Sequence, residues 1–141
     1  MKLEDVQREL TRHFLNCWKN EEGELRTPVV LENEEISDGN ENSPWVRFSV
    51  EIFSFSADSM GSKGNRRVSR YGSVAIQVFV PLNKKTKELN DFIAQIIRIY
   101  EGEKLDNVYF REPRTLAIVE RSDSLWYGTT VTVEFDFTEI I

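Results

Sequence analysis

The sequence predicts an α+β domain, in which a mainly antiparallel sheet carries an N-terminal helix and a second long helix on one face. Two observations predict this class. Within residues 68–80 one face of a period-2 pattern carries Val68, Val74, Ile76, Val78 and Val80, which is typical of a half-buried strand. Residues 86–100 then repeat apolar side chains at i, i+3, i+4 and i+7, which is typical of a helix lying on a sheet. The length of 141 residues fits a single domain spanning residues 1–141.

The N-terminal third predicts a helix and two strands. Residues 2–19 form the helix, whose apolar face would comprise Leu3, Val6, Leu10, Phe14, Cys17 and Trp18. Residues 28–31 predict a short strand, residues 32–44 a polar loop exposed to water, and residues 45–55 a second strand. Alternation along that strand places Val46, Phe48, Val50 and Ile52 on one face, and Trp45, Phe53 and Phe55 on the other. These three aromatic residues form either a patch that needs a partner or part of a second core.

The remaining elements complete the order αβββαββ. Residues 56–65 (SADSMGSKGN) are small and polar, so they predict a long mobile loop at the tip of an extended β-hairpin. The second helix would begin after an N-cap at Asn83 or Thr86 and end at Gly102. Short strand segments at 108–110 and 115–119 follow, and a final strand would turn Val131, Val133, Phe135 and Phe137 inward.

Composition excludes several classes of function. The 24 acidic residues against 18 basic ones give a net charge of −6, which argues against general nucleic-acid binding. No apolar run is long enough for a membrane span, and the charged start of the chain has no signal-peptide pattern. The single cysteine, Cys17, favours a reducing, cytosolic setting. The charge is uneven, with an acidic segment at 21–41 and a basic segment at 59–87.

Residues that could carry chemistry are few. His13 precedes Cys17 by four residues, but two ligands are too few for structural zinc, and a cysteine on an apolar stripe is typical of a core. A triad would have to use His13 on a solvated helix, without a nucleophile elbow. Glu32, Glu34 and Glu35 offer oxygen ligands for a hard cation, yet a solvated acidic loop is more common. We therefore expect no catalytic residue, no metal and no cofactor.

The basic segment predicts an interaction surface or a solvated hairpin tip. A protein partner is favoured over nucleic acid because the chain is acidic overall. One acidic and one basic loop on a small domain suit a head-to-tail assembly. Trp126 falls out of phase with Val131 and Val133, so it joins the aromatic residues that form either a patch that needs a partner or part of a second core. The candidate subunit or tube interface comprises Met60, Lys63, Arg66, Arg67, Arg70, Glu32, Glu34, Glu35 and Trp126.

The layout of the whole chain resembles the tail terminator proteins of long-tailed bacteriophages. The resemblance rests on the leading helix, the Pro-Val-Val strand, the acidic loop, the Gly/Ser/basic hairpin tip, the Gly72-Ser73-Val74-Ala75 segment and the closing Trp126-Tyr127 strand. It implies a structural protein that forms a hexameric ring on the completed tail tube, halts tube polymerisation and offers its other face to the head. It also implies three partners: further copies of the chain, the tail tube protein, and a head-completion or connector protein. The implied location is the host cytoplasm during assembly and then the virion tail.

Three alternatives remain open from the sequence. The chain could be another head-tail joining or minor tail component of related fold. It could be a small nucleic-acid-binding domain that uses the basic hairpin together with Tyr71. Third, it could be a metal-dependent hydrolase that binds its metal through Glu32, Glu34 or Glu35.

Overall fold

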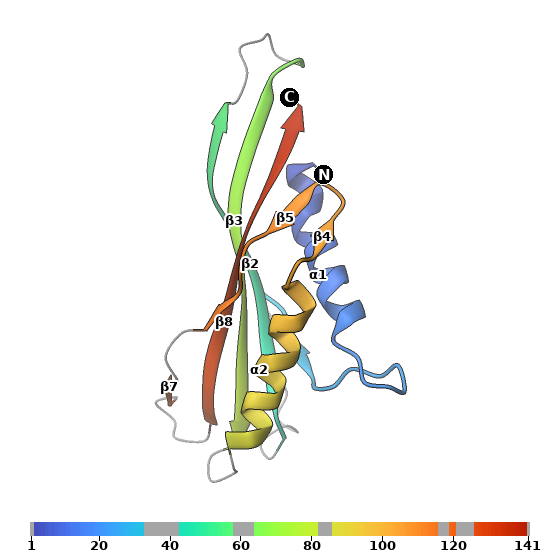
Figure 1. Cartoon of the computed structure of the whole chain (residues 1–141), viewed down its shortest axis with the longest axis vertical. Helices are drawn as coiled ribbons and strands as arrows, with labels where there is room; N and C mark the ends of the chain where they lie inside the picture. Colours follow the sequence, from blue (N-terminus) through green and yellow to red (C-terminus); the bar gives the residue numbers. More distant parts are fainter. Residues whose placement is uncertain are drawn as a thin grey trace.

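The structure, a computed structural model, describes residues 2–32, 43–57, 64–81, 86–115, 119–120 and 126–140. In this part of the chain two helices pack on one face of a sheet (Figure 1). The predicted α+β class with an N-terminal helix is confirmed, and the sheet dominates the fold.

The described elements begin with one helix and three strands. Helix α1 (Leu3–Cys17) and strand β1 (Val29–Val30) precede the long strands β2 (Trp45–Ala57) and β3 (Arg67–Pro81). After α2 (Thr86–Tyr100) come β4 (Lys104–Leu105), β5 (Val108–Phe110), β6 (Arg114–Thr115), β7 (Val119–Glu120) and the long β8 (Trp126–Ile140). The strands are arranged β1-β2-β3-β8-β5-β4, and β6 and β7 also pair with β8. Only β1 and β2 run parallel among the described pairs.

The predicted extended hairpin is the centre of the sheet. Strands β2 and β3 pair antiparallel from Trp45↔Phe79 to Ala57↔Val68, and β8 pairs with β3 along its full length. Strand β2 continues to Ala57, so it takes in two residues of the predicted loop. Residues 58–63, which include Met60 and Lys63, lie outside the described residues.

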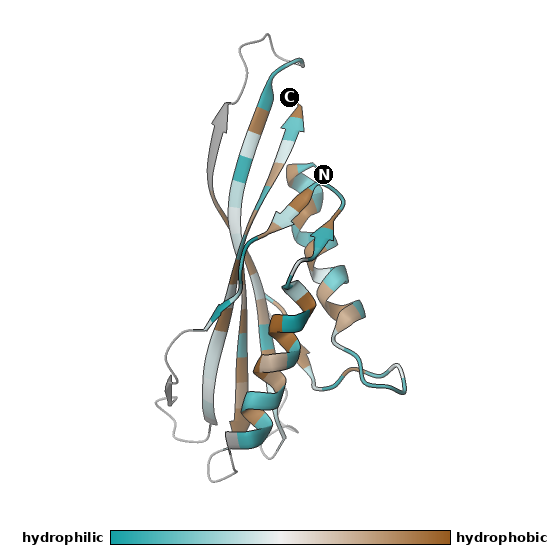
Figure 2. Ribbon diagram, viewed as in Figure 1, coloured by the Kyte–Doolittle hydropathy of each residue, from teal (hydrophilic) through white to brown (hydrophobic). Residues whose placement is uncertain are grey.

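The core lies between the helices and the sheet. Val6, Leu10 and Phe14 of α1 are buried, and the ring of Phe14 stacks on Phe48 of β2 with centroids 4.9 Å apart. Helix α2 contributes Leu89, Ile96 and Tyr100 to the same core, as its periodicity predicts. The facing positions of the long strands are valine, isoleucine and phenylalanine, so apolar bands cross the strands beneath the helices (Figure 2).

Two expectations about α1 are wrong. Cys17 was expected on the buried stripe but is exposed, because the helix ends there and Trp18 fills the core instead. The indole Nε1 of Trp18 donates to Thr27 Oγ1 at 3.0 Å, which satisfies its only donor within the interior. Leu3, in the first turn, is 38% exposed.

The expected aromatic face of β2 is also wrong, because a β-bulge interrupts the strand. The register shifts between Ile52 and Ser54, so Phe55 aligns with Arg70 and no longer shares the alternation of Trp45. Trp45 is buried in a separate small cluster with Val30 and stacks on Phe79 at 4.4 Å. The second-core alternative is therefore correct for Trp45, whereas Phe53 is 54% exposed.

Two glycines have clear structural reasons. Gly102 has φ +65°, which confirms the predicted left-handed residue after α2. A Cβ on Gly72 would collide with the Glu51 carbonyl and lie 2.6 Å from the Phe135 ring, so the sheet needs glycine there. At the other end of α2, Thr86 is the first helical residue, and Asn83 lies outside the described residues.

Candidate interaction surface

The long strands continue past the helices and form an arm, which we define as residues 52–57, 67–72 and 135–140 and whose base still contributes Phe135 and Phe137 to the core (Figure 1). In the helix-covered half, the helix-facing side of β3 and β8 is apolar. In the arm the same side carries Arg70 and Glu139, on neighbouring strands. The arm therefore replaces part of the apolar core with charge.

Arg70 is occupied within its own chain. Its Nε donates to Glu139 Oε2 at 2.8 Å, and the two side chains retain only 13% and 12% exposure. A charge-assisted hydrogen bond at this distance and burial fixes β3 to β8 near the end of the arm. The sequence predicted Arg70 as a surface residue. No local pattern indicates its ion pair with Glu139, which lies two residues beyond its direct register partner Phe137 on β8.

Arg67 is the first residue of β3 and Arg66 immediately precedes it, and both are exposed. They are the described part of the predicted basic hairpin tip. The position agrees with an interaction surface at the end of the arm.

Glu32 has a structural role on the edge of β2. Its Oε1 accepts from the Val50 backbone N–H at 2.7 Å, and its Oε2 accepts from Gln7 Nε2 at 3.1 Å. Strand β1 pairs only with Val46 and Arg47, so the carboxylate caps a donor that β1 leaves without a strand partner. Glu34 and Glu35 lie outside the described residues, so the structure places only one of the three predicted acidic residues.

Trp126 opens β8 opposite Pro81, at the end of the sheet remote from the arm. Its register separates it from Arg66 and Arg67 by the full length of β3. The structure therefore does not bring all of the predicted interface residues together.

A second cluster lies where α1 meets the end of α2 and β5. His13 stacks on Phe110 with ring centroids 5.9 Å apart, and it lies 5.8 Å from the ring of Tyr100. The Cys17 Sγ is 3.7 Å from His13 Nε2, so the four-residue spacing does bring the two together. His13 is half-buried, and the expectation that it lies on a solvated helix face is wrong.

Burial controls the titration of this cluster. Desolvation lowers the pKa of His13, and the negative charge of Glu103 partly opposes that shift. Desolvation raises the pKa of the Cys17 thiol, with a further contribution from Glu103. The pKa of Tyr100 is raised for the same reason, with a smaller contribution from Cys17. These directions favour a neutral imidazole and a protonated thiol, which is the opposite of an activated nucleophile.

The cluster also contains unsatisfied polar atoms. His13 Nδ1 and the Tyr100 hydroxyl are buried without a hydrogen-bond partner among the described residues. Within the same part of the chain, no group of three or more His, Cys, Asp or Glu is placed to hold a metal ion. The arrangement thus provides a packed seam between elements.

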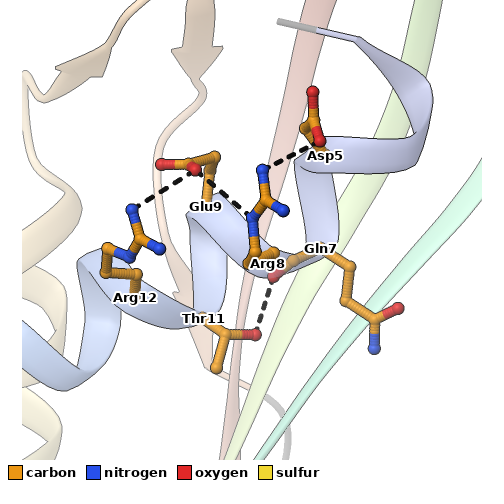
Figure 3. A network of polar contacts seen from close by, with 6 residues as sticks. All are labelled: Asp5, Gln7, Arg8, Glu9, Thr11 and Arg12. Atoms are coloured by element: carbon orange, nitrogen blue, oxygen red, sulfur yellow. Dashed lines mark hydrogen bonds and ion pairs between the residues drawn. The ribbon is translucent and has the colours of Figure 1, made fainter.

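The outer side of α1 is a charged helix surface. The Arg8 guanidinium forms ion pairs with Asp5 (Nη2 to Oδ1, 2.9 Å) and with Glu9 (Nε to Oε1, 3.6 Å). Arg12 Nη1 lies 3.5 Å from the same Glu9 Oε1 (Figure 3). These pairs are exposed and spaced along one helix, so each contributes little to stability. They give the helix a solvated outer side.

Exposed apolar side chains instead gather along the edges of the sheet. Phe53 is 54% exposed on β2, Tyr109 is 53% exposed on β5, and Ile140 is 62% exposed at the end of β8. A hollow of about 380 Å³ lies on the sheet near the base of the arm, lined by Phe53, Tyr71, Gly72, Arg111, Glu134 and Phe135. The alternation of β2 predicted Phe53 as a candidate surface residue. Tyr109 was not predicted, although its central position in the alternating segment 108–110 is the signal for its exposure.

Comparison with protein-family models and with curated proteins gives no match for this chain. In the described residues, neither helix has the length and apolar character needed to cross a lipid bilayer.

Proposed function

We propose that this chain is a structural phage or prophage protein that caps the tail tube as a ring. In this role it ends tube polymerisation and provides the surface to which the head attaches. Its partners are further copies of itself, the tail tube protein and a head-completion or connector protein. It acts in the host cytoplasm during assembly and then remains in the virion tail, with no catalytic residue assigned.

The observation that carries the proposal is the arm. A hairpin that extends past the helices can reach a neighbouring molecule without disturbing the core beneath the helices. Its end presents Arg66 and Arg67, and its edge presents the exposed ring of Phe53. Aromatic and arginine side chains are the types most enriched at protein interfaces. The family resemblance of the sequence adds the ring and the tail tube to this picture.

The solution mass tests the ring. Light scattering over a concentration series should give a mass near roughly six 16.5 kDa subunits, and the assembly should weaken as salt rises. Arg66→Ala/Arg67→Ala should lower the assembled mass while circular dichroism stays unchanged. Arg8→Ala/Arg12→Ala is the matched control, because it removes the same charge from the solvated side of α1. Arg70 is left intact because its ion pair holds the arm together.

A nucleic-acid-binding domain is the second candidate, favoured by the exposed position of Arg66 and Arg67 at the arm. It predicts that Arg66→Ala/Arg67→Ala abolishes salt-dependent binding of a fluorescent oligonucleotide and leaves the mass unchanged. Loss of mass without any oligonucleotide binding supports the ring. Another head-tail joining component would assemble but fail to bind the ends of tail tubes in electron micrographs.

A further inference from the structure

The two opposite edges of the sheet carry complementary groups where the arm begins. Strand β2 forms one edge, since among the described residues β1 covers only Val46 and Arg47. Strands β4 and β5 form the other edge. Glu51 and Phe53 are exposed on the first edge, whereas Lys104 and Tyr109 are exposed on the second.

These groups lie on two neighbouring rows that cross the sheet. Glu51 aligns with Ser73, which aligns with Glu134, and the Glu134 carbonyl accepts from the Arg111 backbone N–H at 2.8 Å. One row of the sheet therefore runs from an acidic side chain at one edge to a basic side chain at the other.

The adjacent row repeats the match with aromatic residues. Ser54, next to the bulged Phe53, aligns with Tyr71, then with Asp136 and finally with Tyr109 of β5. The Lys104 ammonium lies 4.9 Å from the centre of the Tyr109 ring, so a positive charge and an aromatic ring stand together at this edge.

Both edges present these groups on the face away from the helices. Glu51 and Ser73 alternate with the buried positions of β2 and β3. Arg111 pairs with Asp136 at 3.1 Å, and Asp136 alternates with the buried Phe135 and Phe137. The acidic edge and the basic edge thus share one side of the sheet.

We propose that the β2 edge of one copy of this chain docks on the β4–β5 edge of a second copy. Glu51 faces Arg111 of the neighbour at the same height. Lys104 lies one same-face row away, beside Tyr109, so its long side chain reaches Glu51 diagonally while Phe53 packs near Tyr109. A different partner would match one edge only, whereas a second copy satisfies both edges at once. This head-to-tail contact is heterologous, and equal heights on the two edges let it close into a ring without a shift along the strands. The inference rests on the proposed ring and names the surface that would build it.

Reciprocal charge reversal tests the contact. Glu51→Lys places like charges at every interface, and so does Lys104→Glu. Each variant alone should therefore fall from the assembled mass to the 16.5 kDa subunit in light scattering. An equimolar mixture should recover the assembled mass, because Lys at position 51 of one variant meets Glu at position 104 of the other. At the next interface, the native Glu51 of the Lys104→Glu variant meets the native Lys104 of the Glu51→Lys variant. The two variants must therefore alternate around the ring.

Matched controls separate this result from a general charge effect. Glu22→Lys and Lys87→Glu make the same reversals at exposed positions away from both edges, and both should assemble as the unchanged chain does. All variants should keep the far-UV circular dichroism spectrum of the unchanged chain, since the altered side chains are exposed.

The outcomes separate the edge contact from the proposed function. If the unchanged chain assembles and both edge variants assemble equally well, the proposed edge contact is wrong, whereas the proposed ring is not contradicted. Failure of the mixture to assemble, while each variant alone is monomeric, also overturns the pairing of these two edges. An unchanged chain that is monomeric at its highest attainable concentration overturns the contact as a stable interface. Binding to the ends of isolated tail tubes then decides the proposed function separately.

Discussion

The helix-covered half and the arm use the same three strands but are stabilised differently. Under the helices, the inward positions of β3 and β8 are mainly valine and isoleucine, and these side chains are almost completely buried. In the arm the inward side of these strands also carries the Arg70–Glu139 pair, and Phe53 at the edge is 54% exposed. One half of the molecule supplies folding stability, and the other supplies side chains that remain available to neighbours.

The difference follows from what covers each region. A helix laid on a sheet removes apolar side chains from water, and about 25 cal/mol is gained for each Å² of apolar surface so buried. The end of the arm lies past the end of α1 in Figure 1, so an all-apolar face there would remain partly wet. The Arg70–Glu139 ion pair links β3 to β8 without exposing a large apolar patch that would promote aggregation. The bulge at Phe53 adds a twist that discourages uncontrolled edge pairing.

The largest effect on the free energy of unfolding should come from truncating a buried side chain in the core of the helix-covered half. Phe14→Ala removes a ring that is fully buried and stacked on Phe48, so the free energy of unfolding should fall by about 3–5 kcal/mol. Phe53→Ala removes an equally large ring from the sheet edge, where it is 54% exposed, and should change that free energy by less than about 1 kcal/mol. Urea unfolding of dilute protein measures both. Similar losses for the two variants would contradict the division between core and arm.

An intermediate effect should come from the ion pair of the arm. Arg70→Met leaves the Glu139 carboxylate 12% exposed without its partner, so stability should fall by about 2–3 kcal/mol, somewhat below the loss for a fully buried pair. Arg70→Met/Glu139→Leu replaces the pair by apolar side chains and should regain most of that loss. Chemical denaturation of the four members of this double-mutant cycle gives the coupling energy. A double variant no more stable than Arg70→Met would show that the charge pair is not the reason for the loss.

Sequence reasoning found the fold because periodicity reports burial directly. The switch from period 2 in β3 to the helical period in α2 predicted a helix on a sheet, and both elements are present. Periodicity could not predict the β-bulge in β2, because a single extra residue interrupts the alternation. It also could not predict contacts between residues that are far apart in the sequence. The bulge after Ile52 moved Phe55 out of the expected alternation, and no local signal marked it.

The candidate surface was harder to predict because its polar side chains have partners far along the chain. Arg70 and Glu139 are 69 residues apart, and Glu32 and Val50 are 18 apart, so neither contact has a sequence signature. Arg66 and Arg67 could be predicted as exposed because they flank a polar loop. The parallel pairing of β1 with β2 also depends on how the sheet is arranged, and a two-residue strand gives no sign of its direction.

The smallest effect should appear at the seam between α1, the end of α2 and β5, where His13 lies against Phe110 and Tyr100. Burial lowers the pKa of His13 in the folded chain relative to the unfolded chain, despite the opposing charge of Glu103. The unfolded state therefore binds the proton more readily, so this contribution to stability is present at neutral pH and is lost as the pH falls below about 6.5. The thermal midpoint should drop between about pH 7.5 and 5.5, and His13→Gln should flatten that part of the profile because glutamine does not titrate. Cys17→Ser is the control, since the raised pKa of its thiol affects only alkaline pH and should leave the acid slope in place. An acid slope that persists unchanged in His13→Gln would assign it to carboxylates elsewhere and show that the seam is insensitive to protonation.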